Sequence, residues 1–162
     1  MQLRLKLRLL AEPGVVVADV PAVTGDRLPE HLVVRVLVSD VHAASMRAVN
    51  CARTLDIADT RAVFFATDAD DATRMRDAWR RHSPRLSLDV QEAPYRDIGA
   101  PLLTYLRELR AEPETAVLVV MPELVLRGWR RLLHNQRALY VKRLLLFEPH
   151  TILASVPYQL LQ

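Results

Sequence analysis

Five short apolar runs rich in β-branched residues alternate with longer segments that have helical spacing. Residues 32–38 read LVVRVLV, which is typical of a strand buried on both faces of a parallel sheet. Similar runs predict further strands at residues 62–66, 86–90, 116–121 and 151–156. Because only a few residues connect these runs to the helical segments, the pattern indicates a doubly wound α/β sheet.

Helical periodicity predicts helices at residues 43–55, 69–81 and 98–110, and a basic helical stretch at 126–146 with a break near Asn135. In the first helix four apolar residues fall in register: Met46, Val49, Ala52 and Leu55. Asp68 stands where it can cap the second helix. We therefore expect residues 31–162 to form a five-stranded, mostly parallel sheet with helices on both faces.

Residues 1–30 have a different character and are expected to be an N-terminal extension. Leucines alternate strictly with Arg and Lys over residues 3–9, which fits a half-buried strand. The turn residues at 12–14 would allow a hairpin, and a helix entering from an upstream segment is the competing interpretation. Pro and Gly at residues 21–29 indicate a linker before the α/β domain.

Composition excludes several classes of protein. Hydrophobic residues make up 51% of the 162 residues and charged ones 25%, the balance of a packed globular domain. The longest apolar runs have about five residues, whereas a membrane-spanning helix needs roughly 20. No secretory signal is visible, so we expect a cytoplasmic setting. The single cysteine, Cys51, excludes an internal disulfide framework and is expected to be a small buried hydrophobe.

Common enzyme signatures are absent from the chain. The sequence contains no P-loop, Gly-x-Gly-x-x-Gly, Gly-x-Ser-x-Gly or His-Glu-x-x-His motif. The five histidines are scattered, and none pairs with another ligand at metal-binding spacing. We therefore expect a protein without catalytic residues, a metal site or a tightly bound cofactor.

The positive charge of the chain is concentrated near its end. Residues 117–162 contain six Lys or Arg and two Glu, a net charge of +4, whereas the other 116 residues carry −1. Five of the six cations are arginines in the helical stretch, four of them at Arg127, Arg130, Arg131 and Arg137. Such a segment could bind phosphate, lie against an anionic membrane, or simply be a solvated helix face.

The expected ligand crevice lies at the carboxyl ends of the strands, as in other doubly wound sheets. Asp40, after the first strand, could accept hydrogen bonds from a base or ribose, or could cap the following helix. Tyr95 and Arg96, after the third strand, could stack on a base and pair with phosphate, or could anchor a loop. Glu123 follows the fourth strand, and His134 and Asn135 interrupt the basic helix with hydrogen-bonding side chains.

Several of these segments resemble one family. Residues 92–106 (EAPYRDIGAPLLTYL), 119–123 (VVMPE), 129–136 (WRRLLHNQ), 144–149 (LLLFEP) and 156–158 (VPY) are similar to the C-terminal cytosolic domains of bacterial APC-superfamily permeases. These transporters move amino acids or potassium, and their tails resemble universal stress proteins. The likeness covers roughly residues 31–160, and LLHNQ and PYR are its most specific pieces.

The resemblance implies a non-enzymatic regulatory domain on the cytosolic face of the membrane, paired with a second copy through its last strand and joined to a permease. The potassium-importing members respond to cyclic di-AMP, so an adenine nucleotide is the ligand it implies. Universal stress proteins that bind ATP carry Gly-x2-Gly-x9-Gly-Ser/Thr after the fourth strand, and residues 122–131 depart from that pattern. The ligand-binding candidates are then Asp40, Tyr95, Arg96, Glu123, Arg127, Arg130, Arg131, His134, Asn135 and Arg137.

Three other functions remain open at this point. The chain could be a free-standing universal stress protein that binds AMP or ATP, or a structural domain that only dimerises a transporter. A nucleotide hydrolase would need a metal-binding carboxylate and a phosphate loop, for which only Asp40 and Glu123 are candidates. Nucleic acid is not an expected partner.

Overall fold

The computed structural model describes residues 29–82, 85–94, 97–112, 114–125 and 136–159. They form a five-stranded sheet in which every pairing is parallel. The strands are β1 (His31–Leu37), β2 (Thr60–Ala66), β3 (Leu88–Glu92), β4 (Thr115–Val125) and β5 (Thr151–Gln159). The helices are α2 (Ala43–Arg53), α3 (Ala69–His82), α4 (Gly99–Leu109) and α5 (Gln136–Leu145).

The strand order is β3-β2-β1-β4-β5, so β1 lies at the centre of the sheet. After β3, at one edge, the chain crosses over to form β4 on the other side of β1. His31 in β1 is level with Thr115 in β4, and Val117 in β4 is level with Thr151 in β5. The order is that of a doubly wound sheet. The expected fold class is confirmed.

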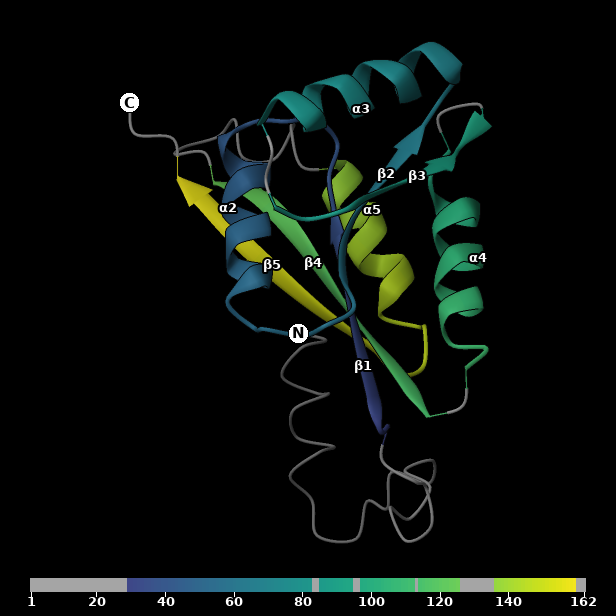
Figure 1. Ribbon diagram of the computed structural model, residues 1–162. Helices are drawn as coiled ribbons and strands as arrows, with labels where there is room; N and C mark the ends of the chain where they lie inside the picture. The colour runs from purple at the N-terminus through teal and green to yellow at the C-terminus, as the bar shows by residue number, and fades with distance from the viewer. Residues whose placement is uncertain (1–28, 83–84, 95–96, 113, 126–135, 160–162) are drawn as a thin grey trace, which may run out of the picture.

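Helices cover both faces of this sheet (Figure 1). On one face α2 and α3 bury Val49, Met75 and Trp79 against β1 and β2. On the other face α4 buries Leu102 and Leu106, and α5 buries Val141 and Leu145, against β2 and β4. Right-handed crossovers explain this division, because the chain moves outward from β1 to β3 and then returns across the other face. Among the helices that the structure describes, none is both long and apolar enough to span a bilayer.

The fourth and fifth strands are longer than predicted. β4 continues to Val125 rather than ending at Met121, and β5 continues to Gln159 rather than Val156. Beyond Met121, β4 has passed its last pairing with β1 and stays paired with β5. Pro122, which has no N–H to donate, is therefore tolerated in β4, since one side of the strand is an edge there.

Helix α2 presents the predicted face in part. Its buried residues are Ala44, Ser45, Ala48, Val49 and Ala52. Val49 and Ala52 are buried as predicted, and Met46 is partly buried against the same core. Leu55 lies beyond the end of the helix with its side chain exposed, so that part of the prediction was wrong. Cys51 is exposed as well, so the expectation that it is a buried hydrophobe was wrong. Because these buried side chains are small, α2 can lie close to β1 and β4.

Arg35 is buried in the middle of β1, with 2% of its surface exposed. Its Nε donates to the Tyr105 hydroxyl and its Nη2 to Asp59 Oδ2, both at 2.9 Å. Its Nη1 donates to the backbone carbonyls of Val34 at 3.0 Å and Asp59 at 2.9 Å. The Tyr105 hydroxyl in turn donates to Asp89 Oδ2 at 3.0 Å. These bonds, the Arg35 network, join β1, the residue before β2, β3 and α4.

The Arg35 network shifts the pKa values of its members. The hydrogen bond from Arg35 lowers the pKa of Asp59, and the charge of Arg61 adds to that effect. Burial raises the pKa of Tyr105 to about 12; Arg35 opposes this rise and Asp89 reinforces it. Both shifts favour the protonation states present at neutral pH, a carboxylate and a phenol.

Gly99, at the start of α4, lies close to α5. A Cβ at this position would contact the Tyr140 hydroxyl at less than van der Waals distance and would lie 3.2 Å from Leu144 Cδ1. The Gly99 N–H donates to Asp97 Oδ1 at 2.9 Å, which satisfies one donor at the start of the helix. The absence of a side chain therefore lets α4 and α5 pack together.

We expect Gly99→Ala to destabilise the domain by at most about 1 kcal/mol, because the half-exposed Tyr140 side chain must move its hydroxyl away from the new Cβ. In a Tyr140→Phe background the same change should cost little, since the overlapping oxygen is gone. Urea unfolding of the two single variants and the double variant gives the coupling energy. An equal cost in both backgrounds would contradict the contact.

Candidate functional site

The carboxyl ends of β1, β2 and β4 form the rim where the sequence analysis placed a ligand. β1 and β4 are neighbours, and the chain leaves them toward opposite faces, through α2 and α5. A crevice outside such a switch point is the usual ligand site of doubly wound sheets. Asp40 lies just beyond β1 and Glu123 lies in the last part of β4, so the structure brings these two predicted residues to one edge.

Asp40 is exposed at this rim, and its Oδ1 accepts a hydrogen bond from the Val41 N–H at 2.7 Å. The residue that caps α2 is His42, whose Nδ1 accepts from the Ser45 N–H at 3.1 Å. The alternative in which Asp40 caps the helix was therefore wrong. A histidine fills the position because an unprotonated ring nitrogen can accept the orphan N–H of the first turn.

The start of α3 completes this side of the rim. Asp68 Oδ1 accepts from the Asp71 N–H at 2.7 Å, which confirms the predicted cap, and Asp71 Oδ2 accepts from the Thr67 N–H at 3.1 Å. Arg74 pairs with Asp71. The hydrogen bond that Arg74 donates to Asp71 raises the pKa of Arg74, and the charges of Asp71, Asp40 and Asp68 add to this rise. Asp40 therefore belongs to a group of carboxylates around one exposed arginine.

Glu123 lies on the other side of the switch point and pairs with a lysine. Lys142 Nζ in α5 donates to Glu123 Oε2 at 2.7 Å, and both side chains are about one-quarter exposed. Sequence reasoning counted Lys142 in the basic segment but did not place it in the site. The sequence does not show that Lys142 lies near Glu123, because the two come together only when α5 packs against β4.

The other predicted site residues stay predictions. Tyr95, Arg96, Arg127, Arg130, Arg131, His134 and Asn135 lie outside the described residues, and of Arg137 only its place in α5 is described. The proposed extension over residues 1–28, as a hairpin or a helix, also lies outside them.

The described part of the rim suits the polar edges of a ligand better than its phosphates. Asp40, Asp68, Asp71 and Glu123 supply carboxylate oxygens, which accept hydrogen bonds from ribose hydroxyls or a base amino group. Arg74 and Lys142 already pair with Asp71 and Glu123. In the part of the chain that the structure describes, no three His, Cys, Asp or Glu residues are grouped as metal ligands.

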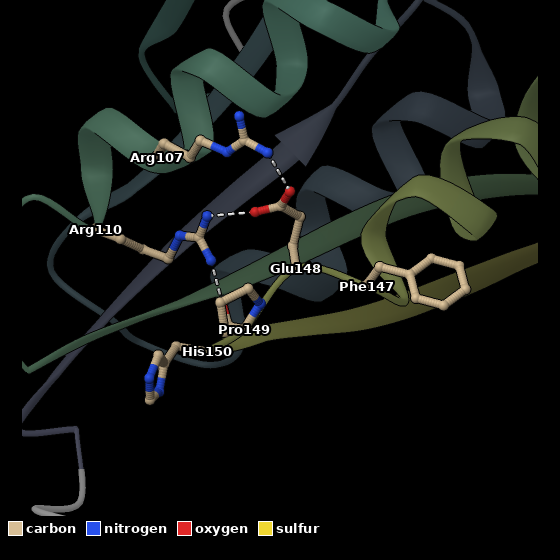
Figure 2. Close-up of a pocket in the computed structure, with 6 residues that line it drawn as sticks. All are labelled: Arg107, Arg110, Phe147, Glu148, Pro149 and His150. Atoms are coloured by element: carbon tan, nitrogen blue, oxygen red, sulfur yellow. Dashed lines mark hydrogen bonds and ion pairs between the residues drawn. The ribbon is translucent and has the colours of Figure 1, made fainter.

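A second polar cluster lies at the opposite edge, where the strands begin. Glu148, with a nearly buried side chain, accepts from Arg107 Nη2 at 2.9 Å and from Arg110 Nη2 at 2.5 Å (Figure 2). Arg110 also donates to the Pro149 carbonyl. These residues line a shallow hollow of about 410 Å³ together with Phe147 and His150. Sequence reasoning did not find this cluster.

Burial by itself would raise the pKa of Glu148, but the hydrogen bonds and charges of Arg107 and Arg110 outweigh it and lower that pKa. The carboxylate is therefore ionised at neutral pH and holds the C-terminal end of α4 to the turn before β5. Glu148 is committed to these two arginines, so the cluster is a clamp between α4 and that turn.

The strand order, with its switch point between β1 and β4, defines a doubly wound α/β domain. The family model described as the KimA potassium transporter C-terminal domain matches residues 29–158, and the chain belongs to that family. No curated protein matches the chain. The predicted similarity to the C-terminal domain of a permease is confirmed. The likeness to universal stress proteins stays a prediction.

Proposed function

We propose that this chain is a non-catalytic regulatory domain of a potassium transporter and that it senses an adenine nucleotide such as cyclic di-AMP. Membership of the KimA C-terminal domain family is the observation that carries the proposal. A transporter would sit in the membrane and this domain on its cytosolic side. The ligand would bias transport by binding one state of the domain more tightly than the other.

The nucleotide would bind at the carboxyl rim of the sheet. Asp40, and the Glu123 and Lys142 pair, flank the switch point from β1, β4 and α5. In this arrangement Asp40 reads a ribose or base edge, Tyr95 stacks on a base, and Arg130 and Arg131 meet phosphate. Asn135 is a further candidate for reading a polar edge of the ligand.

The domain would act as a dimer that pairs through β5. In the described residues β5 has a neighbouring strand on one side only, which is β4. Ile152 is half-exposed near the start of β5, and Pro157 stands near its end. An edge strand of nine residues offers unpaired backbone groups to a second copy. The same edge favours the alternative function, a dimerisation domain that binds no nucleotide.

Isothermal titration of the 162-residue chain with cyclic di-AMP, AMP and ATP tests the proposal. We expect cyclic di-AMP to bind with a Kd well below about 1 mM. The double variant Arg130→Ala and Arg131→Ala should bind at least about tenfold more weakly, because two charge-assisted contacts to phosphate are lost. The matched control is Arg80→Ala with Arg81→Ala, which removes the same charge at the end of α3.

Equal weakening by both double variants would show a general effect of charge and would move the site away from Arg130 and Arg131. If none of the three nucleotides binds, the sensing role fails and the dimerisation alternative gains. Magnesium-dependent turnover of ATP would contradict a non-catalytic domain. Binding of ATP or AMP in preference to cyclic di-AMP would favour a universal-stress-type nucleotide binder.

A further inference from the structure

Two large apolar side chains stand out from the surface between α5 and β5. Leu146 is 76% exposed and Phe147 is 81% exposed, the highest values among the large hydrophobic residues that the structure describes. Single exposed leucines are ordinary on protein surfaces, but an adjacent leucine and phenylalanine at one tip have no role in the core. We call residues 146–150 the apolar turn.

The apolar turn is held in place by its backbone and by α4. The N–H groups of Leu146 and Phe147 donate to Lys142 and Leu144 carbonyls at 3.1 and 3.3 Å. Glu148 is clamped by Arg107 and Arg110. Figure 2 shows the Phe147 ring pointing away from this clamp. The protein therefore presents the two apolar side chains from a fixed support.

Exposed arginines flank the apolar turn on α4 and in the last turn of α5. Arg143 is exposed in the last turn of α5, directly before the apolar turn. Arg107 is exposed beside Glu148, and His150 is exposed at the end of the turn. Glu148, whose side chain is 8% exposed, is neutralised by its two arginines. The exposed charge next to Leu146 and Phe147 is therefore positive.

The apolar turn lies at the edge of the sheet where the chain enters the domain. The His31 N–H at the start of β1 donates to the Glu114 carbonyl at 3.1 Å, and the Val117 N–H donates to the His150 carbonyl at 2.9 Å. The start of β4 thus lies between the start of β1, where the chain enters the domain, and the apolar turn before β5. In a transporter that carries this domain at its C-terminus, the membrane part precedes β1; this step rests on the proposed function.

We propose that the apolar turn is a membrane contact that binds the surface of a bilayer with anionic headgroups. Leu146 and Phe147 enter the boundary between headgroups and acyl chains, and Arg107 and Arg143 lie at the level of the phosphates. An exposed aromatic and aliphatic pair flanked by cations has the chemistry of an interfacial anchor. The clamp at Glu148 keeps the pair oriented toward the lipid without a loss of conformational freedom on binding.

Sedimentation with sucrose-loaded vesicles tests this contact in the absence of nucleotide. The 162-residue chain is mixed with vesicles of phosphatidylcholine alone or with phosphatidylglycerol added. We expect binding that requires phosphatidylglycerol and weakens in 0.5 M salt, at a Debye length of about 4 Å. The double variant Leu146→Ser and Phe147→Ser should lose at least about tenfold in partition coefficient.

The matched control is Leu139→Ser, which removes an exposed leucine at the other end of α5, where 59% of its surface is accessible. This control should bind vesicles as the unmodified chain does. Because the basic and apolar residues at 3–9 could bind lipid by themselves, the comparison between variants decides the question. Circular dichroism confirms that each variant is folded.

Retention of vesicle binding in the Leu146 and Phe147 variant would overturn the proposal, as would equal loss in the Leu139 variant. Absence of binding to phosphatidylglycerol vesicles would also overturn it, and equal binding to neutral vesicles would overturn the role of anionic headgroups. Nucleotide titration is carried out without lipid, so the two proposals fail separately. A chain that binds vesicles through this turn but binds no nucleotide keeps the membrane contact and loses the sensing role.

Discussion

Arg35→Met is expected to destabilise the domain by about 2–4 kcal/mol, because methionine fills the space of the arginine but makes none of its hydrogen bonds. Arg35 donates to Tyr105, to the Asp59 carboxylate and to the carbonyls of Val34 and Asp59. The loss of stability is smaller than for breaking a fully buried ion pair, because the Asp59 side chain is 41% exposed and water can solvate its carboxylate. Urea unfolding followed by the fluorescence of the buried Trp79 measures the change.

Arg61→Met is the matched control for this prediction. Arg61 contacts the same Asp59 at 3.2 Å, but its side chain is half-exposed on the neighbouring strand. Exposed ion pairs contribute little, so we expect a change well under 1 kcal/mol. If the two methionine variants were equally stable, the Arg35 network would be irrelevant to the fold.

Leu102→Ala should cost about 2–5 kcal/mol, because it leaves a cavity in the core between α4 and the sheet. Leu102 is fully buried and belongs to the cluster that contains Val63, Val117 and Leu106. These neighbours come from β2, β4 and α4, so the cavity cannot close by the movement of one side chain. The midpoint of urea unfolding gives the loss, with an unchanged slope if the unfolded state is unaffected.

Leu103→Ala provides the comparison on the same helix. Leu103 is adjacent in sequence and of the same type, but its side chain is only partly buried. We expect it to cost less than half as much as the change at Leu102. A similar loss at both positions would mean that α4 packs against the sheet in a different rotation.

The order of strands and helices could be predicted because a buried parallel strand has its own sequence pattern. The run at 32–38 indicated β1 correctly, but Arg35 within it gave no indication of its role. Its partners Asp59 and Tyr105 lie 24 and 70 positions away, and only the folded sheet brings them together. Periodicity in one segment contains no information about such distant pairing.

Details that depend on a neighbouring element were the ones that failed. The end of β4 is decided by its pairing with β5, and the burial of Ala44, Ser45 and Ala48 by the packing of α2 on the sheet. In the site, Asp40 and Glu123 could be placed at one edge because topology determines where parallel strands end. Lys142 and the Glu148 clamp could not be placed, since each requires knowledge of how α4 and α5 pack.

The pairing of β1 with β4 has a consequence for how the chain folds as it is synthesised. His31 pairs with Thr115, more than 80 positions later, and all the elements from α2 to α4 lie between them in the sequence. At about 5–20 residues per second, several seconds separate the two strands during synthesis. Of the five described strands the central one is therefore made first, and the ribosome must release β4 before β1 gains its second neighbour.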